Sequence, residues 1–195
     1  MPLVLAVLVV LAAATVSAAG PLDSPGALKA LNCTACHGPA GLSPSADVPI
    51  LAGMNAAYFK KAIEDYAAGR RASPEMEPYA KQVLQLGVDD VAAYFAGQKP
   101  AATRVRIDRA AAERGRAAAV QCSTCHGARG EGDAAKGIPD LRGQPPGYLR
   151  QQMILFKQDR RSPGDERLKP IKALMRDIPE ATFADLAAYF ASQAR

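Results

Sequence analysis

The pentapeptide Cys33-Thr34-Ala35-Cys36-His37 determines the predicted fold. The same pattern recurs as Cys122-Ser123-Thr124-Cys125-His126. The spacing C-x-x-C-H is the signature of covalent haem attachment. Two thiols three residues apart at the end of a helix reach the two vinyl groups of one porphyrin, and the histidine that follows offers its imidazole to the iron. The sequence therefore predicts two covalently bound haem c groups, with His37 and His126 as axial iron ligands and four cysteines as attachment points, Cys33, Cys36, Cys122 and Cys125.

The chain has no other cysteine or histidine. Two structural disulfides, or one zinc ion bound by all four cysteines, would not explain why a histidine follows each second cysteine. A thioredoxin-like redox motif would need a βαβ context, which the helical pattern of this sequence does not provide. With two histidines in all, a three-histidine zinc site and bis-histidine haem ligation in both halves are excluded.

The sequence around the two pentapeptides repeats as well. Gly26 and the first pentapeptide recur 89 positions later, and the stretch from Pro49 to Arg71 recurs in part 90 positions later. The segment AAYFAGQ at 92–98 returns as AAYFASQ at 187–193, a shift of 95. The chain is therefore a duplication, with five extra residues between Arg161 and Tyr189.

We expect four segments: a signal peptide over 1–19, a first domain over 20–98, a linker over 99–107 and a second domain over 108–195. Residues 1–19 are almost wholly apolar and end in small residues that suit signal peptidase, which indicates a periplasmic or secreted protein. No Lys or Arg precedes Lys29, and the stretch is nearly long enough to span a bilayer. An uncleaved membrane anchor is therefore the rival interpretation.

Apolar residues at helical spacing predict an all-α fold of two small domains, each around one haem. The runs are Tyr58 to Tyr66, with Gly69 placed to end the helix, and Tyr148 to Phe156. Asp108 is placed to cap the helix that follows the linker. No β-branched run alternates with polar residues as a strand would.

Beyond the signal peptide, the whole sequence resembles the tandem dihaem class I cytochromes of the c-four type. The resemblance rests on the two pentapeptides, the tripeptides Leu-Ala-Gly at 51–53 and Leu-Arg-Gly at 141–143, the Arg-Arg pairs and the AAYFA(G/S)Q segments. It implies an electron carrier rather than an enzyme. The implied donor is a quinol-oxidising complex or a flavoprotein, and the implied acceptor is a terminal oxidase.

The resemblance also implies roles for residues outside the pentapeptides. The carbonyls of Pro49 and Pro139 would orient the imidazoles of His37 and His126, which fixes the tautomer of each. Gly26 would lie where the first helix crosses the last one, at Tyr94 or Phe95. Gly115 would do the same in the second half, at Tyr189 or Phe190.

Methionine is the natural sixth iron ligand, because the histidines and cysteines are already used. Of the methionines beyond the signal peptide, Met54 adjoins the Gly53 turn and Met153 lies on a core helix face, so both are interpreted as packing residues. Met76 is predicted to bind the first iron, since it lies eighteen residues before Tyr94, where the resembled family places its ligand.

The sixth ligand of the second iron is harder to assign. Met76-Glu77-Pro78 aligns with Leu168-Lys169-Pro170, and leucine cannot bind iron. Met175 lies seven residues after Leu168, and we expect the longer loop of this half to be re-routed so that Met175 binds the iron. The alternatives are a vacant sixth position, or Lys169 or Lys172 as ligand.

The charge distribution differs between the halves. Residues 20–100 hold 7 Lys and Arg against 8 Asp and Glu, a net charge of −1, and residues 101–195 hold 17 against 11, a net charge of +6. A basic second half favours an acidic partner or peripheral contact with an anionic membrane face. The scattered cations carry no nucleic-acid recognition motif, so nucleic-acid binding is not expected. The arginine pairs at 70–71 and 160–161 either neutralise haem propionates or hold the loop.

Two other functions fit the same motifs. The cytochrome subunit of a flavocytochrome sulfide dehydrogenase resembles this tandem and would relay electrons from a flavoprotein. A dihaem redox enzyme would use an open second haem. A peroxidase is disfavoured by the short chain, and a thiosulfate-oxidising enzyme by the lack of a fifth cysteine to serve as an axial thiolate.

Overall fold

The structure is a computed structural model that describes residues 23–195, so the predicted signal peptide over 1–19 lies outside the described residues. Across 23–195 there is no β-strand, only two isolated bridges, Arg71 with Arg161 and Asp133 with Ile138. The all-α prediction is therefore confirmed. No helix in this range is long and apolar enough to cross a membrane.

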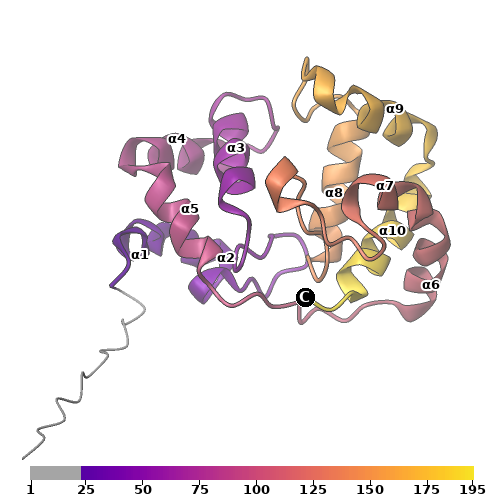
Figure 1. Ribbon diagram of the computed structural model, residues 1–195, viewed down its shortest axis with the longest axis horizontal. Helices are drawn as coiled ribbons and strands as arrows, with labels where there is room; N and C mark the ends of the chain where they lie inside the picture. Colours follow the sequence, from indigo (N-terminus) through magenta and orange to yellow (C-terminus); the bar gives the residue numbers. More distant parts are fainter. Residues whose placement is uncertain (1–22) are drawn as a thin grey trace, which may run out of the picture.

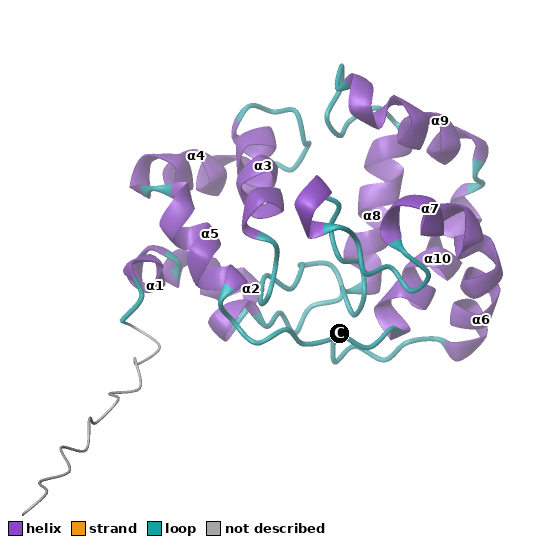
Figure 2. Cartoon of the chain, in the orientation of Figure 1, coloured by secondary structure: helices purple, strands orange, loops and turns teal. Residues whose placement is uncertain are grey.

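The chain folds into two helical halves that lie side by side and are joined by an extended segment along one edge (Figures 1 and 2). The helices of the first half are α1 (Pro25–Lys29), α2 (Thr34–His37), α3 (Ala56–Ala67), α4 (Met76–Leu86) and α5 (Val88–Ala96). Those of the second half are α6 (Arg109–Ala118), α7 (Ser123–His126), α8 (Pro146–Lys157), α9 (Lys169–Asp177) and α10 (Glu180–Ser192). The elements recur in the same order, as the duplication predicts.

Local chemistry accounts for where the main helices begin and end. The side chain of Asn55 accepts a hydrogen bond from the Tyr58 amide at 2.9 Å and caps α3. Gly69 follows α3 with a φ of +69°, a conformation that favours glycine and ends the helix. Asp108 Oδ1 accepts bonds from the amides of Ala110 and Ala111, which confirms the predicted cap of α6.

Each half has its own apolar core. The first is built around α3 and α5, where Val91 and Phe95 are fully buried. The second is built around α8 and α10, where Phe183 and Leu186 are fully buried. Most of the apolar residues at helical spacing in the sequence face these cores. Cys33 packs against the first core and Cys122 against the second, so the two pentapeptides lie at corresponding positions.

The first and last helices of each half cross at a glycine. A Cβ atom placed on Gly26 would lie 2.0 Å from the carbonyl oxygen of Asp90 and 2.8 Å from Tyr94 Cβ. On Gly115 it would lie 1.9 Å from the carbonyl oxygen of Asp185 and 2.9 Å from Tyr189 Cβ. Both crossings therefore require glycine, and the tyrosine of each implied pair is the contact residue.

The five extra residues of the second half, between Arg161 and Tyr189, are divided between the loop before α9 and the start of α10. Eight residues separate Arg161 from the start of α9, but only five separate Arg71 from the start of α4. Helix α10 begins nine residues before Tyr189, whereas α5 begins six before Tyr94. The starts of the last two helices are eleven residues apart in the second half and twelve in the first, which completes the difference of five.

Candidate haem-binding sites

Both pentapeptides form the same local structure. A 3-10 turn ends at the first cysteine, Cys33 or Cys122, and leads directly into α2 or α7, which ends at the histidine. The four thiols are free, with the first cysteine of each pair half-buried and the second exposed. Burial raises the pKa of Cys33 and of Cys122. Each pair of thiols is thus available for two thioether bonds, and the disulfide alternative finds no support.

Each histidine is held by a proline carbonyl. His37 Nδ1 donates to the Pro49 oxygen at 2.8 Å, and His126 Nδ1 donates to the Pro139 oxygen at 3.1 Å. His37 is buried, with 5% of its surface exposed. Because Nδ1 carries the proton in this arrangement, Nε2 is the nitrogen that is left with a lone pair for iron.

The surroundings of the histidines favour the neutral imidazole. Burial lowers the pKa of His37 and outweighs the bond to Pro49, which raises it. Burial likewise lowers the pKa of His126 against the bond to Pro139, and the charge of Arg161 lowers it further. A neutral imidazole is the form that binds a metal, so both histidines are in the protonation state in which they can bind iron.

The glycine tripeptides fix the loops that carry the two prolines. The Gly53 amide donates to the Phe95 carbonyl at 2.8 Å, and the Gly143 amide donates to the Phe190 carbonyl at 2.9 Å. Each loop is therefore tied to the last helix of its own half. The histidine, the proline carbonyl and the core helix form one connected unit in each half.

The four methionines considered as ligands all pack against an apolar core. Met76 is the first residue of α4 and packs against the core of the first half, as Cys33 and Met54 do. Met175 lies in the core of the second half with 9% of its surface exposed, and Cys122 and Met153 pack against the same core. The axial roles of Met76 and Met175 stay predictions.

The second half lacks a methionine at the position that Met76 occupies in α4. Leu168 directly precedes α9 there, and Met175 lies six residues into the helix rather than in a loop. Lys172 is buried and donates to Asp159 Oδ1 at 2.5 Å and to the Ser162 carbonyl at 2.6 Å. Lys169 is exposed and paired with Glu166 at 3.2 Å. Both lysines are thus engaged elsewhere.

Arg71 crosses from the first half into the second. One guanidinium nitrogen donates to Tyr148 Oη at 2.8 Å and to Gln152 Oε1 at 2.7 Å. The guanidinium also lies 4.5 Å from the centre of the Tyr66 ring, and only 3% of the Arg71 surface is exposed. The sequence left two roles open for the paired arginines, neutralising haem propionates or holding the loop. The structure shows that Arg71 bonds to side chains of the other half and so helps to hold the two halves together.

Arg161 makes the reciprocal contact. It donates to Tyr58 Oη at 2.9 Å and to Gln152 Oε1 at 3.1 Å. The crossed pairs, Arg71 with Tyr148 and Arg161 with Tyr58, follow the duplication because each member has its counterpart 90 positions away. Sequence reasoning missed Gln152, which both arginines share; its counterpart in the first half is Ala62, and that departure from the repeat was the available signal.

Neither Arg71 nor Arg161 pairs with a carboxylate of residues 23–195. Burial raises the pKa of the Tyr58 phenol, but the charges of Arg161 and Arg71 outweigh it and lower that pKa to about 7. A buried cation is costly unless an anion balances it. The buried Arg71 guanidinium therefore has no carboxylate of the described residues to balance it, which leaves its charge available to a porphyrin carboxylate.

Side-chain bonds of Asp65 and Gln144 also join the halves, beside backbone bonds such as that from the Ala72 amide to the Arg160 carbonyl. The Asp65 carboxylate, 5% exposed, accepts bonds from Lys61, from Arg70 Nε at 2.9 Å and from Ser162 Oγ at 3.0 Å. The Gln144 amide donates to the Ile50 carbonyl at 2.8 Å and accepts from the Ile50 amide at 3.0 Å. Gln144 departs from the repeat, where its counterpart is Met54, and that departure was the available signal.

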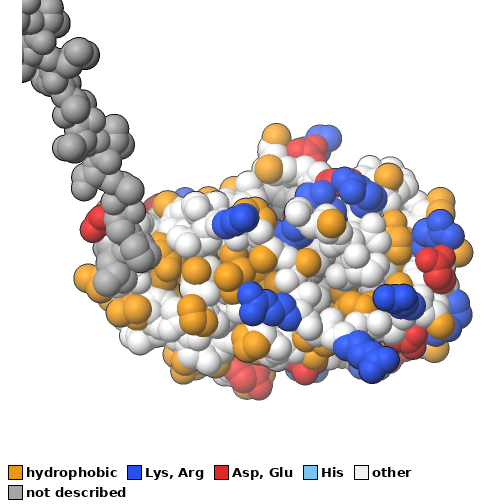
Figure 3. Space-filling model, turned by 90° about the horizontal axis from the view of Figure 1, so that it is seen from below, with side chains coloured by type: hydrophobic (Ala, Val, Ile, Leu, Met, Phe, Trp, Pro, Cys, Tyr) orange, Lys and Arg blue, Asp and Glu red, His pale blue; other side chains and the backbone are white. Residues whose placement is uncertain are grey.

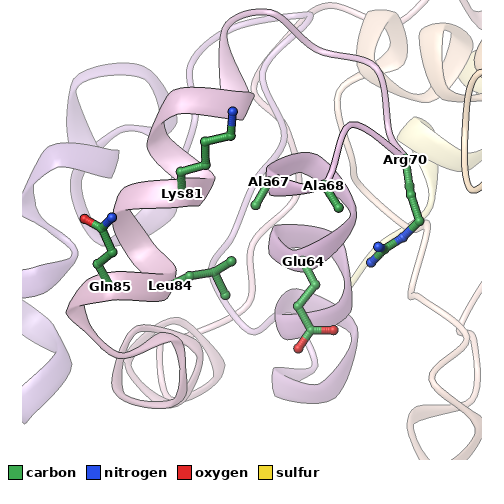
Figure 4. A pocket seen from close by; sticks show the side chains of 7 residues that line it. All are labelled: Glu64, Ala67, Ala68, Arg70, Lys81, Leu84 and Gln85. Carbon is green, nitrogen blue, oxygen red and sulfur yellow. The ribbon is translucent and has the colours of Figure 1, made fainter.

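A pocket of about 580 Å³ lies apart from these sites, between α3 and α4. Figure 4 shows its lining side chains, Glu64, Ala67, Ala68, Arg70, Lys81, Leu84 and Gln85. It contains no cysteine, histidine or methionine, so we assign it no part in haem binding.

The cytochrome c domain family matches residues 112–194. Cytochrome c4 of Pseudomonas aeruginosa is 31% identical over 84% of this chain and 85% of its own length. A thiosulfate dehydrogenase electron acceptor of Stutzerimonas stutzeri is 32% identical over 84% of this chain and 79% of its own. The crystal structure of reduced cytochrome c4 from Pseudomonas stutzeri superposes with a TM-score of 0.77 at 26% identity, covering 90% of this chain and all of that one.

Proposed function

Since the chain belongs to the cytochrome c4 family of dihaem class I cytochromes, we propose that it carries electrons between two redox proteins in the periplasm, one electron per haem. Two covalently bound haem c groups supply the redox chemistry. One observation carries the proposal: in each half an imidazole, buried at His37 and half-buried at His126, is held through Nδ1 by a proline carbonyl, directly after two free thiols.

The residues of the chain provide attachment, ligation and charge balance. Cys33 and Cys36 would bind the first porphyrin and Cys122 and Cys125 the second, with His37 and His126 as proximal ligands oriented by Pro49 and Pro139. Arg71 and Arg161 would balance porphyrin carboxylates. No general base or substrate pocket is assigned, since electron transfer needs neither.

We infer that Met76 and Met175 complete the coordination of the two irons. A thioether ligand raises the reduction potential into the range that suits a respiratory carrier. The position of Met76 at the start of α4 and the burial of Met175 in the core against which Cys122 packs support the assignment. The engagement of Lys169 and Lys172 in other bonds argues against lysine ligation.

Replacing each methionine by leucine tests this assignment, because leucine preserves volume but cannot bind iron. We expect Met76→Leu and Met175→Leu each to remove half of the near-infrared band of thioether-ligated ferric haem and to lower one of two potentials in a spectroscopic redox titration. Met54→Leu and Met153→Leu are matched controls that should change neither. Rapid carbon monoxide binding to half of the ferrous haem in the wild type would contradict ligation by Met175.

A second role is favoured by one comparison: the chain covers most of a relative named as the electron acceptor of a thiosulfate dehydrogenase. The electron donor in that case would be an enzyme that oxidises an inorganic sulfur compound. Mixing the oxidised holoprotein with a thiosulfate dehydrogenase and thiosulfate tests this, and reduction of the haem bands only with all three present would support it. Co-purification with a flavin-bearing chain would instead favour the flavocytochrome alternative, and turnover of peroxide or thiosulfate by the protein alone would favour a dihaem enzyme.

A further inference from the structure

Residues 99–109, which we call the linker strap, comprise the linker between the halves, the capping residue Asp108 and the first residue of α6, and they carry a row of cations. Lys99, Arg104, Arg106 and Arg109 are all exposed, and none of them forms an ion pair with any part of the chain that the structure describes. The only acid in the strap is Asp108, and its carboxylate caps α6. The strap therefore presents uncompensated positive charge to solvent.

The strap has a fixed path over the two halves. A Cβ atom on Gly53 would lie 2.4 Å from Pro100 Cγ, and one on Gly143 would lie 2.6 Å from Ala102 Cβ, so the strap packs closely on both glycines. The Thr103 amide donates to the Gly143 carbonyl at 2.7 Å. The arginine and lysine side chains are thus attached to a backbone that is already ordered, so less conformational entropy is lost when a ligand binds them.

Side chains alternate along the middle of the strap. Arg104 and Arg106 are exposed, whereas Val105 and Ile107 are half-buried and Ile107 packs against the core of the second half. This is the period of two expected for an extended segment. The outer face of the strap is therefore cationic, with no aromatic or large apolar side chain directed outward.

The strap lies on the loops that hold the two proximal histidines. Gly53 and Gly143, which it covers, follow Pro49 and Pro139 by four residues. In Figure 1 the strap runs along the lower edge of the molecule beneath both halves. Figure 3, seen from below, shows Lys and Arg side chains on this face, with acidic side chains mostly toward its margins. A molecule bound here would lie close to both histidine loops.

We propose that the linker strap is the docking site for an acidic surface of a redox partner protein. The proposal rests on the proposed function, because an electron carrier must bind its donor and its acceptor transiently. Rows of opposite charge steer two proteins together and accelerate association without forming a long-lived complex. The absence of outward aromatic or large apolar side chains on the described strap favours a protein over a lipid surface, since interfacial binding uses such residues.

Binding of a fluorescent poly-L-glutamate peptide to the holoprotein tests the charge of the strap. The variant R104Q/R106Q is compared with R150Q/R176Q, which removes two exposed and unpaired arginines from the same half outside the strap. The side chains of both pairs are exposed and form no hydrogen bond or ion pair with a predicted haem residue of the described chain; Arg176 follows Met175 in the sequence, so the redox titration of R150Q/R176Q is run beside the binding assay. At low ionic strength we expect R104Q/R106Q to weaken binding roughly tenfold and R150Q/R176Q by less than about twofold. Equal weakening by both variants would overturn the proposal, because net charge alone would then explain it.

Position and partner class are tested on the same sample. Carbodiimide cross-linking should join the glutamate peptide to Lys99, whereas cross-links at the exposed lysines Lys81 or Lys169 in place of Lys99 would contradict the docking site. Vesicles with anionic phosphatidylglycerol serve as the competing surface, and binding to them without binding to the peptide would overturn a protein partner. A redox titration of the same holoprotein reports on the proposed function separately, so the two failures are distinguishable.

Discussion

Two glycines decide how closely the first and last helices of each half approach one another. At Gly26 and Gly115 the opposing backbone occupies the place where a Cβ atom would stand. Neither glycine has the positive φ that would require it for backbone reasons. The requirement is therefore purely one of space between two packed helices.

Replacing Gly115 by alanine should separate α6 from α10, since the added carbon would lie 1.9 Å from the Asp185 carbonyl oxygen. We expect a loss of about 1–3 kcal/mol in the free energy of unfolding, as is typical of overpacking. Chemical denaturation of the holoprotein measures it. Gly97→Ala is the control, because Gly97 has a φ of −78° and its Cβ would meet the nearest atom at 3.4 Å. Similar stability of the two variants would contradict the account.

At the scale of elements, helix α3 is tied to the loop between α8 and α9. Asp65 near the end of α3 accepts bonds from Lys61 and Arg70 of its own half and from Ser162 of that loop. Burial raises the pKa of Asp65, but these hydrogen bonds together outweigh it, and the net shift is downward. A carboxyl whose pKa is lowered by folding stabilises the fold above its unfolded pKa, and the contribution is lost as the pH falls through the folded value.

We therefore expect the wild-type protein to lose stability as the pH falls below about 4, the ordinary pKa of an aspartic acid. Asp65→Asn should be less stable at neutral pH by about 1–3 kcal/mol, since the buried side chain loses the charge-assisted hydrogen bonds that its carboxylate accepts from Lys61 and Arg70. The difference between the two proteins should shrink in acid. Unfolding free energies at a series of pH values measure it, and a difference that does not change with pH would rule out the carboxylate as the cause.

The helices were predictable from the sequence, but their contacts between halves were not. Periodicity in the run from Tyr58 to Tyr66 and the position of Asp108 each depend on a few neighbouring residues, and both predictions are confirmed. The extra residues after Arg161 were expected in one re-routed loop around Met175. The structure distributes them between the loop and the start of α10, because an alignment offset fixes only their total.

At the scale of the whole molecule, crossed pairs join the two halves. Arg71 and Arg161 each reach a tyrosine of the other half, and both share Gln152. The sequence repeat showed that these arginines correspond but not that they meet, since a duplication does not determine how its copies pack. For the same reason the reciprocal bonds of Gln144 were not predicted.

Replacing Arg71 by leucine should weaken the contact between the halves. The change leaves Tyr148 without the Arg71 donor and Gln152 with Arg161 as its remaining donor, and we expect a loss of about 2–4 kcal/mol. Calorimetry of the holoprotein should show one unfolding transition in the wild type and two in Arg71→Leu, because each half has its own core. Arg150→Leu changes an exposed arginine of the second half and should behave as the wild type does. A single unshifted transition in Arg71→Leu would show that this arginine does not couple the halves.

The proposed electron-carrier function depends on covalent haem at both pentapeptides. The most direct test is the mass of the intact protein, purified under denaturing conditions from a host with a working cytochrome maturation system. We predict the mass of the polypeptide plus two haem groups, and Cys36→Ser with Cys33→Ser should reduce it by one haem. A colourless protein with the mass of the bare polypeptide would contradict the central claim.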